Sequence, residues 1–382
     1  MSNKRVVVLG AGIAGLSTAT LLLQQEKGFE VHIVAKHFPG DLSGEYTSPW
    51  AGAHWRSHAT KDDTRQQEFD RITYNHLWKL AKVPQNETGI MIIDEFEYWE
   101  KFPQDFSDPW FKTLCHEYRH LRKEELPIGV EFGITYKSSN LSKKFFIYNF
   151  NLFMTDRDDY SLQVSINPLT YLSYLLNTFT SLGGTTQRVN LFSHLNECIK
   201  SETDIVINCS GIHARTLGGV EDPNVYAARG QTVIAQLPRS YINWAFFKRG
   251  EYGKLCLAAN GGEITYAIPH DDGEVVLGGT YDEHKYSTDI DYNTAKEIIQ
   301  RCLATRPDLL PKDQTQLTIK RHGVGLRPCR KGGVRIEAEW TISEKFGKKI
   351  LICHNYGHGG SGYESSHGTA QHALKVLKEA LH

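Results

Sequence analysis

The feature that most constrains the fold is a glycine-rich turn close to the N-terminus. Residues 5–9 (RVVVL) predict a short buried strand, and residues 10–15 (GAGIAG) follow it in a G-x-G-x-x-G pattern. Apolar and small residues then recur at helical spacing over 16–25, and residues 30–35 (EVHIVA) predict a second strand. This order of strand, glycine turn, helix and strand is typical of the start of a parallel, doubly wound sheet.

The glycines of this turn have separate tasks in dinucleotide binding. Gly10 permits the tight turn, Gly12 lets a pyrophosphate approach the backbone, and Gly15 lets the helix and strand pack closely. The N-terminus of the helix then faces the phosphates. The pattern predicts a dinucleotide site, with a ligand-free glycine turn as the alternative. Its predicted members are Gly10, Ala11, Gly12, Ile13, Ala14 and Gly15.

The acidic residue that usually binds the ribose is missing from its expected place. A standard NAD site carries it about 20 positions after the glycines, whereas the second strand here ends in Ala35, Lys36 and His37. The positive side chain of Lys36 argues against a standard NAD site. It is compatible with FAD or with a phosphorylated ribose, and the motif alone leaves both open.

Composition indicates an ordinary globular chain whose length favours two or three domains. The 382 residues carry a formal net charge of -1, without the clustered basic excess that predicts a nucleic-acid partner. No apolar run is long enough to predict a membrane helix, and the first strand begins too early for a signal peptide. Seven widely spaced cysteines without a C-x-x-C pair predict reduced, mostly buried thiols in an intracellular compartment. They predict neither a metal site nor a disulfide framework.

The rest of the chain mixes parallel and antiparallel signals. Residues 86–160 form an irregular, aromatic and charged stretch without a clear strand or helix period. The remaining predicted elements are a helix that begins at Asn167 and Pro168, an antiparallel strand at 229–235, a hairpin at 266–279, a buried strand at 349–353 and a final helix at 366–381. Parallel-sheet signals at both ends, with antiparallel ones between them, predict two interleaved domains.

Four further segments resemble the D-amino-acid oxidase family, in particular its fungal members. They are residues 46–55 (YTSPWAGAHW), 208–219 (NCSGIHAR, then LGG at 217–219), 323–333 (GVGLRPCRKGG) and 354–363 (HNYGHGGSGY). The resemblance spans nearly the whole chain, and four motifs in order are more specific than the glycine turn.

The resemblance implies an α/β (α+β) fold in which a Rossmann-like FAD-binding domain is interleaved with an antiparallel-sheet substrate domain. We predict the FAD-binding domain in residues 1–85, 160–230 and 320–382, and the substrate domain in 86–159 and 231–319. The flavin ring would lie where the domains meet. Besides the glycine turn, the implied FAD contacts are Lys36, Thr47, Ser48, Gly52, Ala53, Val189, Ser210, Gly211, Gly357, Gly359, Gly360 and Ser361.

The resemblance also implies the chemistry and its residues. Arg327 would hold the substrate α-carboxylate, since a guanidinium makes two charge-assisted bonds to one carboxylate. Tyr266 and Tyr281 match two active-site tyrosines of the family. The implied reaction is hydride transfer from the substrate Cα to FAD, followed by reoxidation with dioxygen. Its products are hydrogen peroxide, ammonium and a 2-oxo acid.

The preferred side chain of the substrate depends on a few residues. The predicted pocket residues are His58, Arg56 and Gly360, and Lys248 and Arg249 are further sources of positive charge. Family members that prefer D-aspartate resemble this chain in carrying a histidine at the position of His58. Animal members of that kind carry an arginine where this chain has Tyr281. Because of His58 and the nearby positive charges, we expect acidic D-amino acids as substrates. Tyr281 keeps neutral D-amino acids open as the alternative.

Two other readings stay open: a flavin dehydrogenase or glycine-oxidase-like enzyme, and a non-catalytic flavin-binding protein. The family usually carries a C-terminal peroxisomal signal of the SKL type. This chain ends in EALH, so a peroxisomal location rests on the resemblance alone. A short segment at 340–349 leaves a monomer or a homodimer open, and we expect no metal ion and no membrane partner.

Overall fold

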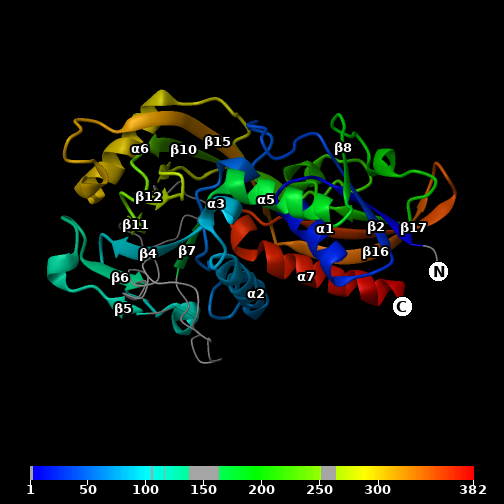
Figure 1. The fold of residues 1–382 in the computed structure, drawn as a ribbon, viewed down its shortest axis with the longest axis horizontal. Helices are drawn as coiled ribbons and strands as arrows, with labels where there is room; N and C mark the ends of the chain where they lie inside the picture. Colours follow the sequence, from blue (N-terminus) through cyan, green and yellow to red (C-terminus); the bar gives the residue numbers. More distant parts are fainter. Residues whose placement is uncertain (1–2, 105, 116, 137–162, 251–263) are drawn as a thin grey trace.

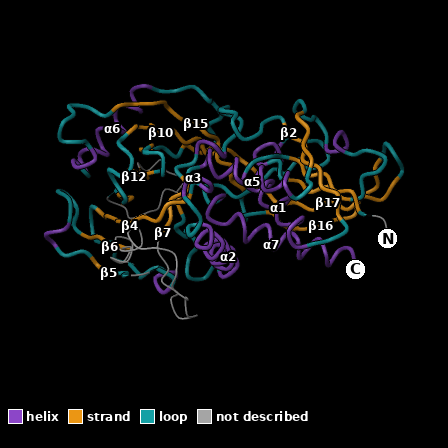
Figure 2. Tube along the Cα trace, in the orientation of Figure 1, coloured by secondary structure: helices purple, strands orange, loops and turns teal. Residues whose placement is uncertain are grey.

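The computed structural model describes residues 3–104, 106–115, 117–136, 163–250 and 264–382. Its strands form two β-sheets toward opposite ends of an elongated molecule, with several helices between and beside them (Figure 1). Figure 2 shows helices α1, α5 and α7 alongside the strands of the first sheet, in which the N-terminal strand takes part. The two sheets correspond to the parallel and antiparallel signals of the sequence.

The first sheet has six strands in the order β16-β17-β9-β1-β2-β8. Neighbouring strands from β17 to β8 are parallel, and β16 is antiparallel to β17. The strands are β1 (Lys4–Leu9), β2 (Phe29–Ala35), β8 (Thr185–Arg188), β9 (Ile205–Asn208), β16 (Arg335–Ser343) and β17 (Lys348–Tyr356). This sheet confirms the Rossmann-like part of the predicted fold, and the N-terminal and C-terminal ends of the chain both contribute to it.

Two helices, α1 (Ile13–Gln25) and α7 (Gly362–Leu381), pack together against the first sheet, and α5 (Pro168–Ser181) packs on α1. A fourth helix, α2 (Thr64–Leu80), packs on α7. Helix α5 begins as predicted, because the Asn167 side chain accepts hydrogen bonds from the backbone N–H of Leu169 and Thr170. Helix α7 starts four residues earlier than predicted, at the end of the glycine-rich turn, so its first turn also reaches the cavity described below.

The second sheet has eleven strands and is mostly antiparallel. Its main path is β14-β10-β13-β12-β11-β4-β6-β5, while β15 pairs with β10, β7 with β4, and β3 with β7. The strands are β3 (Ala53–His54), β4 (Ile90–Trp99), β5 (Arg119–His120), β6 (Phe132–Tyr136), β7 (Gln163–Ile166), β10 (Val225–Gln236), β11 (Trp244–Arg249), β12 (Ile264–Pro269), β13 (Glu274–Gly278), β14 (Asp282–Glu283) and β15 (Thr318–Arg330). The predicted hairpin is confirmed as β12 and β13, and the alternating segment as antiparallel β10.

The prediction of an irregular stretch from residue 86 was wrong for β4, which is ten residues long. Strand β4 lies between β11, to which it is parallel, and β6, to which it is antiparallel. Glu95 and Glu97 interrupt the apolar pattern, yet both side chains are fully buried. Glu97 is paired with two arginines inside the protein, whereas burial and Glu97 raise the pKa of Glu95. Neither effect can be seen in the local sequence. The helices α2, α3 (Gln85–Thr88) and α6 (Tyr292–Thr305) were also not predicted.

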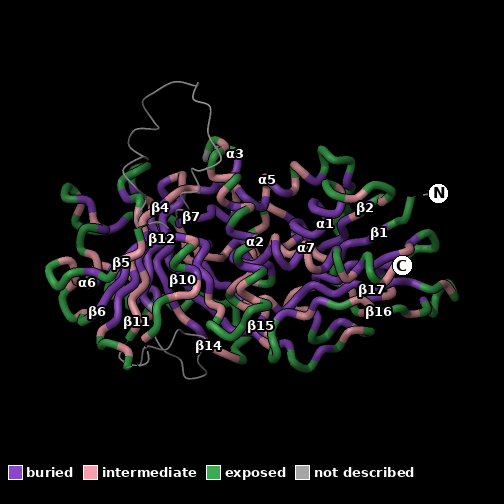
Figure 3. Tube along the Cα trace, turned by 90° about the horizontal axis from the view of Figure 1, so that it is seen from below, coloured by how far each residue is buried: buried purple, intermediate pink, exposed green. Residues whose placement is uncertain are grey.

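Most exposed residues of the described chain lie in turns and outer loops, and the interior strands of both sheets are buried (Figure 3). Six cysteines are free and buried, as expected, and Cys256 lies outside the described residues. None of the helices in the described ranges combines the length and apolarity needed to cross a membrane. Strands β10 and β15 continue across the domain boundaries proposed at 230/231 and 319/320, and the division into domains stays a prediction.

Candidate active site and cofactor cleft

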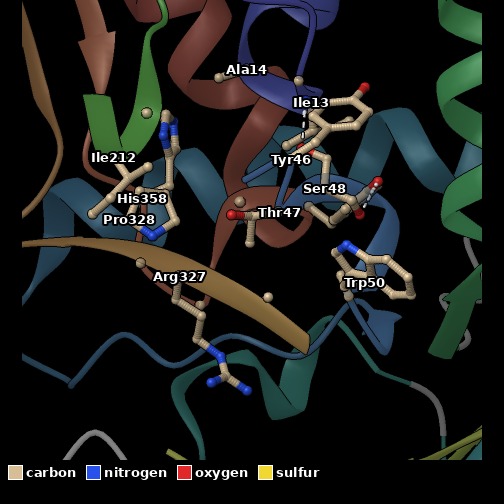
Figure 4. Close-up of a pocket in the computed structure, with 18 of the residues that line it drawn as sticks. Ile13, Ala14, Tyr46, Thr47, Ser48, Trp50, Ile212, Arg327, Pro328 and His358 are labelled. Carbon is tan, nitrogen blue, oxygen red and sulfur yellow. Dashed lines mark hydrogen bonds between the residues drawn. The ribbon is translucent and has the colours of Figure 1, made fainter. Parts of the chain in front are cut away.

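A cavity of about 340 Å³ is lined by residues from both sheets. From the first sheet it takes the ends of β1 and β2, and from the second it takes parts of β10, β12 and β15. Figure 4 shows Ile13 and Ala14 at the start of α1, labelled residues between Tyr46 and Trp50, and Arg327 of β15 around this space. The cavity is therefore built from segments far apart in the sequence.

The glycine turn leaves the N-terminus of α1 open to an anion. Gly10 has a φ of 106°, and a Cβ there would lie 2.5 Å from the carbonyl oxygen of Cys209. A Cβ on Gly15 would overlap the Gly10 carbonyl oxygen, so Gly15 serves packing behind the wall. No side chain caps the start of α1, and its first turn has no acidic residue. This arrangement suits a phosphate group.

A carboxylate group, that of Glu45, lies near the end of β2, although no acidic residue follows this strand directly in the sequence. Glu45 lines the cavity and pairs with the ammonium group of Lys36. The hydrogen bond from Lys36 lowers the pKa of Glu45, with a further hydrogen bond from His37. The sequence prediction searched only the end of the second strand and missed Glu45. It lies one residue before the YTSPWAGAHW motif, so that motif was the available signal.

The 46–53 segment joins the glycine turn to the second sheet. The Tyr46 hydroxyl donates to the Ala11 carbonyl oxygen at 2.7 Å, and the backbone N–H of Ile13 donates to Ser48 Oγ at 3.1 Å. Thr47 Oγ1 donates to the carbonyl oxygen of Leu326 in β15 at 2.6 Å. These bonds place the segment against both sides of the cavity.

Four buried polar atoms of residues on the wall have no hydrogen-bond partner in the described chain. They are Ser210 Oγ, after β9, Asn355 Oδ1, in β17, Thr232 Oγ1, in β10, and His54 Nε2, in β3. Buried polar atoms are normally satisfied, so such atoms on a cavity wall indicate a bound polar ligand. Together with the open end of α1 and the Glu45 carboxylate, they fit the polar parts of FAD.

Most predicted cofactor residues lie on the cavity wall. Those on the wall are Gly10, Ala11, Gly12, Ile13, Ala14, Lys36, Thr47, Ser48, Gly52, Ala53, Ser210, Gly211, Gly359, Gly360 and Ser361. Gly15, Val189 and Gly357 are not. Val189 packs against the apolar cluster on the first sheet, and a Cβ on Gly357 would lie 2.8 Å from Arg330 Cβ. His358, between two predicted glycines, was missed and lines the cavity.

The three predicted catalytic residues also meet at the cavity. The guanidinium carbon of Arg327 lies 5.3 Å from the ring centre of Tyr281, and Nη1 donates to the Thr280 carbonyl oxygen at 3.2 Å. Gly230 makes room for it, because a Cβ there would lie 2.3 Å from Nη1. Burial raises the pKa of Tyr266, with Arg327 opposing this effect. Burial likewise raises the pKa of Tyr281, so the hydroxyl groups of Tyr266 and Tyr281 both stay protonated at neutral pH.

Arg327 differs in its surroundings from the other two arginines of β15, Arg321 and Arg330. No carboxylate of the described residues forms an ion pair with Arg327, although it lines the cavity. By contrast, Arg321 pairs with Glu274, and Arg330 pairs with Asp222. An unpaired guanidinium on a cavity wall is suited to a carboxylate ligand.

Arg56 does not line the cavity, so its prediction as a pocket residue was wrong. Arg56 donates from Nε to Glu97 Oε1 at 3.0 Å and from Nη2 to Oε2 at 2.8 Å. Arg249 donates to the same carboxylate at 2.8 Å, and Lys248 pairs with Glu100. Arg56 and Arg249 are held there because a buried carboxylate requires charged partners. None of the three cations lines the cavity.

Two of the histidines that line the cavity lie near Arg56: His58, as predicted, and His54, which the sequence prediction missed. Burial and the charge of Arg56 lower the pKa of His58 to about 3. The pKa of His54 is also well below its usual value, first because of burial, and its ring stacks on Phe247 at 4.5 Å. Both imidazoles are therefore neutral at physiological pH. Glu364, in the first turn of α7, lies beside His58 on the same wall.

One group of possible metal ligands occurs in the described residues, formed by His270, Asp272 and Glu274. The Glu274 carboxylate already pairs with Arg321 and Lys320. Two cations on one carboxylate oppose the binding of a metal ion, and the group does not line the cavity.

Comparison with known proteins supports the interpretation of this cavity as an FAD site. Residues 5–137 and 160–375 match the family described as FAD dependent oxidoreductase (DAO). A D-amino-acid oxidase of Fusarium vanettenii is 31% identical and covers 99% of this chain and 97% of its own length. A D-aspartate oxidase of Cryptococcus neoformans var. grubii is 28% identical, covering 99% and 98%. The solved glycine oxidase of Bacillus cereus has a TM-score of 0.68 at 14% identity, covering 99% and 96%, which shows a shared fold. The chain is a member of the DAO family of FAD-dependent oxidoreductases, and FAD is its cofactor.

Proposed function

We propose that the protein oxidises D-amino acids with dioxygen and prefers those with an acidic side chain. The products would be a 2-oxo acid, ammonium and hydrogen peroxide. The observation that carries this proposal is the Arg327 guanidinium, which lines the cavity without a carboxylate partner in the described chain. The full-length similarity to relatives named D-amino-acid oxidase and D-aspartate oxidase supports it.

The residues of the chain mainly position the substrate. Arg327 would bind the α-carboxylate through two N–H donors, and the hydroxyl groups of Tyr266 and Tyr281 border the same space. Bound FAD would supply the acceptor for the hydride from the substrate Cα, which carries both electrons of the oxidation. A substrate held at its carboxylate loses most of its orientational freedom, which is the contribution expected from the protein.

The charges behind His54 and His58 support the preference for an acidic side chain. Arg56 and Arg249 share the Glu97 carboxylate and lower its pKa to about 2 against the effect of burial. Glu97 is therefore ionised at neutral pH. Burial and the nearby Glu97 raise the pKa of Glu95 well above its usual value. With Glu95 protonated, the cluster carries more positive than negative charge. Its field favours a second carboxylate near His58.

A neutral side chain is the second candidate, and an apolar part of the wall next to His54 favours it. Phe247 stacks on Tyr266 with ring centres 5.6 Å apart, and Ile268 lines the cavity beside them. These apolar groups would bind an alkyl or thioether side chain through the hydrophobic effect.

Peroxide release in air tests the proposal, with purified holoenzyme and D-Asp, D-Glu, D-Ala and D-Met, each against its L-form. We expect D-Asp and D-Glu to give the highest kcat/KM. Higher values for D-Ala and D-Met would keep D-amino-acid oxidation and exclude the acidic preference. Reduction of the flavin without peroxide would identify a dehydrogenase. A holoenzyme whose flavin no D-amino acid reduces would be a non-catalytic flavin-binding protein.

A further inference from the structure

A short chain of hydrogen bonds leads from the cavity wall into the protein behind His58. The His58 backbone N–H donates to Glu364 Oε1 at 2.8 Å, and His58 Nδ1 lies 2.5 Å from Glu364 Oε2. Glu364 also hydrogen bonds to the carboxyl group of Asp70 in α2. The exposed fractions of Glu364 and Asp70 are 4% and 0%. Since both carboxyl groups are shielded from bulk water, the neighbouring protein groups determine which of them is protonated.

Asp70 is the member of the chain that keeps its proton. Its oxygens accept hydrogen bonds from Ser57 Oγ at 2.6 Å and Gln66 Nε2 at 2.7 Å. Burial and the adjacent Glu364 raise the pKa of Asp70 well above its usual value. Two carboxyl groups in hydrogen-bond contact require a proton between them. Asp70 therefore donates to Glu364 and holds that carboxyl group against His58.

The contact with Glu364 leaves the second ring nitrogen of His58 to the substrate. The side chain lines the cavity, and no residue in the described ranges hydrogen bonds to Nε2. If Glu364 is ionised, it accepts a hydrogen bond from Nδ1–H, and the neutral ring presents a lone pair at Nε2. If Glu364 is protonated, it donates to Nδ1, and the hydrogen of the ring is at Nε2. A single proton thus changes Nε2 from an acceptor to a donor.

We propose that the His58–Glu364 pair selects the substrate side chain by taking up one proton when a second carboxylate binds. The proton makes Nε2 a donor to that carboxylate and changes the charge of the pair from -1 to 0, which removes a repulsion. An uncharged side chain needs neither change, so its binding is independent of this proton. The inference rests on the proposed preference for acidic substrates. Asp70 acts as a positioning residue, because it acts through Glu364.

The surrounding groups place this proton exchange near neutral pH. Burial raises the pKa of Glu364 to about 7, whereas burial and Arg56 lower the pKa of His58 to about 3. The proton therefore resides on Glu364 and not as a second proton on the ring. The charged and titratable groups that face the pair are Asp70 from α2, Glu95 and Glu97 from β4, Arg249 from β11, His54 from β3, and Arg56.

Binding of two unreactive ligands to the oxidised holoenzyme tests the inference without turnover. Malonate has two carboxylates and propionate has one, and the flavin absorbance would report the Kd of each between about pH 6.5 and 9. We expect the Kd of malonate to rise about tenfold per pH unit above about pH 7, because the proton-loaded pair binds it. The Kd of propionate should stay constant. Calorimetry at about pH 8 in two buffers of different ionisation enthalpy should count roughly one proton taken up per malonate and none per propionate.

Two isosteric variants identify the group that exchanges the proton. Glu364→Gln offers an amide donor to Nδ1 and cannot ionise, so the Kd of malonate should lose its dependence on pH. Asp70→Asn is the matched control, since its amide imitates the protonated acid and should preserve that dependence. A tenfold rise per pH unit that persists in Glu364→Gln would overturn the assignment.

The outcomes separate this inference from the proposed function. If D-Asp is a good substrate and malonate binds with a constant Kd and no proton uptake, proton uptake by the His58–Glu364 pair is excluded. The proposed function then still stands. If malonate does not bind and D-Ala is preferred over D-Asp, the acidic preference fails, and the inference with it. The proton count of the unmodified enzyme decides the question even if Glu364→Gln does not fold.

Discussion

The guanidinium carbon of Arg327 lies 5.3 Å from the centre of the Tyr281 ring, and the pair stands on the cavity wall. The Tyr281 hydroxyl is 3.4 Å from the sulfur of Cys329, a contact that holds the ring beside the arginine. The arginine is thus kept in place by an aromatic ring and a backbone carbonyl, while its charge is left for a ligand.

Removal of this charge should reduce substrate binding and leave the fold intact. Arg327→Ala removes two charge-assisted hydrogen bonds worth about 2–4 kcal/mol, so kcat/KM should fall roughly 30- to 1000-fold. The fall should come mainly from KM, and FAD should stay bound. Steady-state peroxide assays and the flavin absorbance would measure both effects. Lys331→Ala, which removes an exposed charge four residues away, is the control. Unchanged kinetics in Arg327→Ala would remove Arg327 from the site.

Two glycines of the same turn should respond differently to alanine. A Cβ on Gly12 would meet only Ser48 Oγ closely, at 3.0 Å, but it would enter the space before α1 where a phosphate fits. Gly12→Ala should therefore weaken FAD binding at least tenfold, with a small effect on the unfolding midpoint of the apoprotein.

Gly10→Ala should mainly destabilise the apoprotein, because Gly10 has a φ of 106° and its Cβ would lie 2.5 Å from a backbone oxygen. Flavin fluorescence titration and urea unfolding distinguish the two variants. Equal losses of stability would contradict the separate roles of Gly10 and Gly12.

The buried arginine pair behind the cavity should depend on a single carboxylate. Glu97→Gln leaves Arg56 and Arg249 without their ionised partner, which should cost about 3–5 kcal/mol of unfolding free energy. Urea unfolding would measure the loss. Glu124→Gln, at an exposed position, should leave the midpoint unchanged. A loss below about 1 kcal/mol in Glu97→Gln would mean that Glu95 ionises in its place.

A stacked pair of histidines should make the protein sensitive to acid. The rings of His76 in α2 and His367 in α7 lie 3.8 Å apart at an angle of 5°. Burial, and for His76 also the neighbouring His367, lowers their pKa values to about 3 and about 4. The folded protein then binds fewer protons than the unfolded chain. Their contribution to stability is complete above about pH 6.5 and is lost as the pH falls toward 4.

The variant His76→Phe would keep an aromatic ring at this position and remove one titrating group. Its unfolding free energy should change less than that of the unmodified protein between about pH 6.5 and 4, by a few kcal/mol at most. Urea unfolding at a series of pH values would measure this difference. The same pH dependence in both proteins would show that other groups control the response to acid.

The sequence alone predicted the parts of the protein that depend on local backbone requirements. A strand that turns directly into a helix needs glycine at Gly10, and the Asn167–Pro168 pair is a local signal for a helix start, so both were correctly predicted. The resemblance of 323–333 and 354–363 to one family also led to Arg327 and to the glycine loop. Both features lie on the wall of the cavity.

Only the tertiary structure decided which charges meet. Arg56 and Arg249 are 41 and 152 residues from Glu97. Arg249 reaches it because β11 pairs with β4, and Arg56 because it follows β3, which is joined to β4 through β7. His58 meets Glu364 across 306 residues, and Glu45 lines the cavity from a loop after β2. The partner that satisfies a buried charge is set by long-range packing, and no local pattern encodes it. For this reason the sequence predicted the family and the place of Arg327 on the wall, whereas the structure was needed to find Glu45 and the partners of His58 and Arg56.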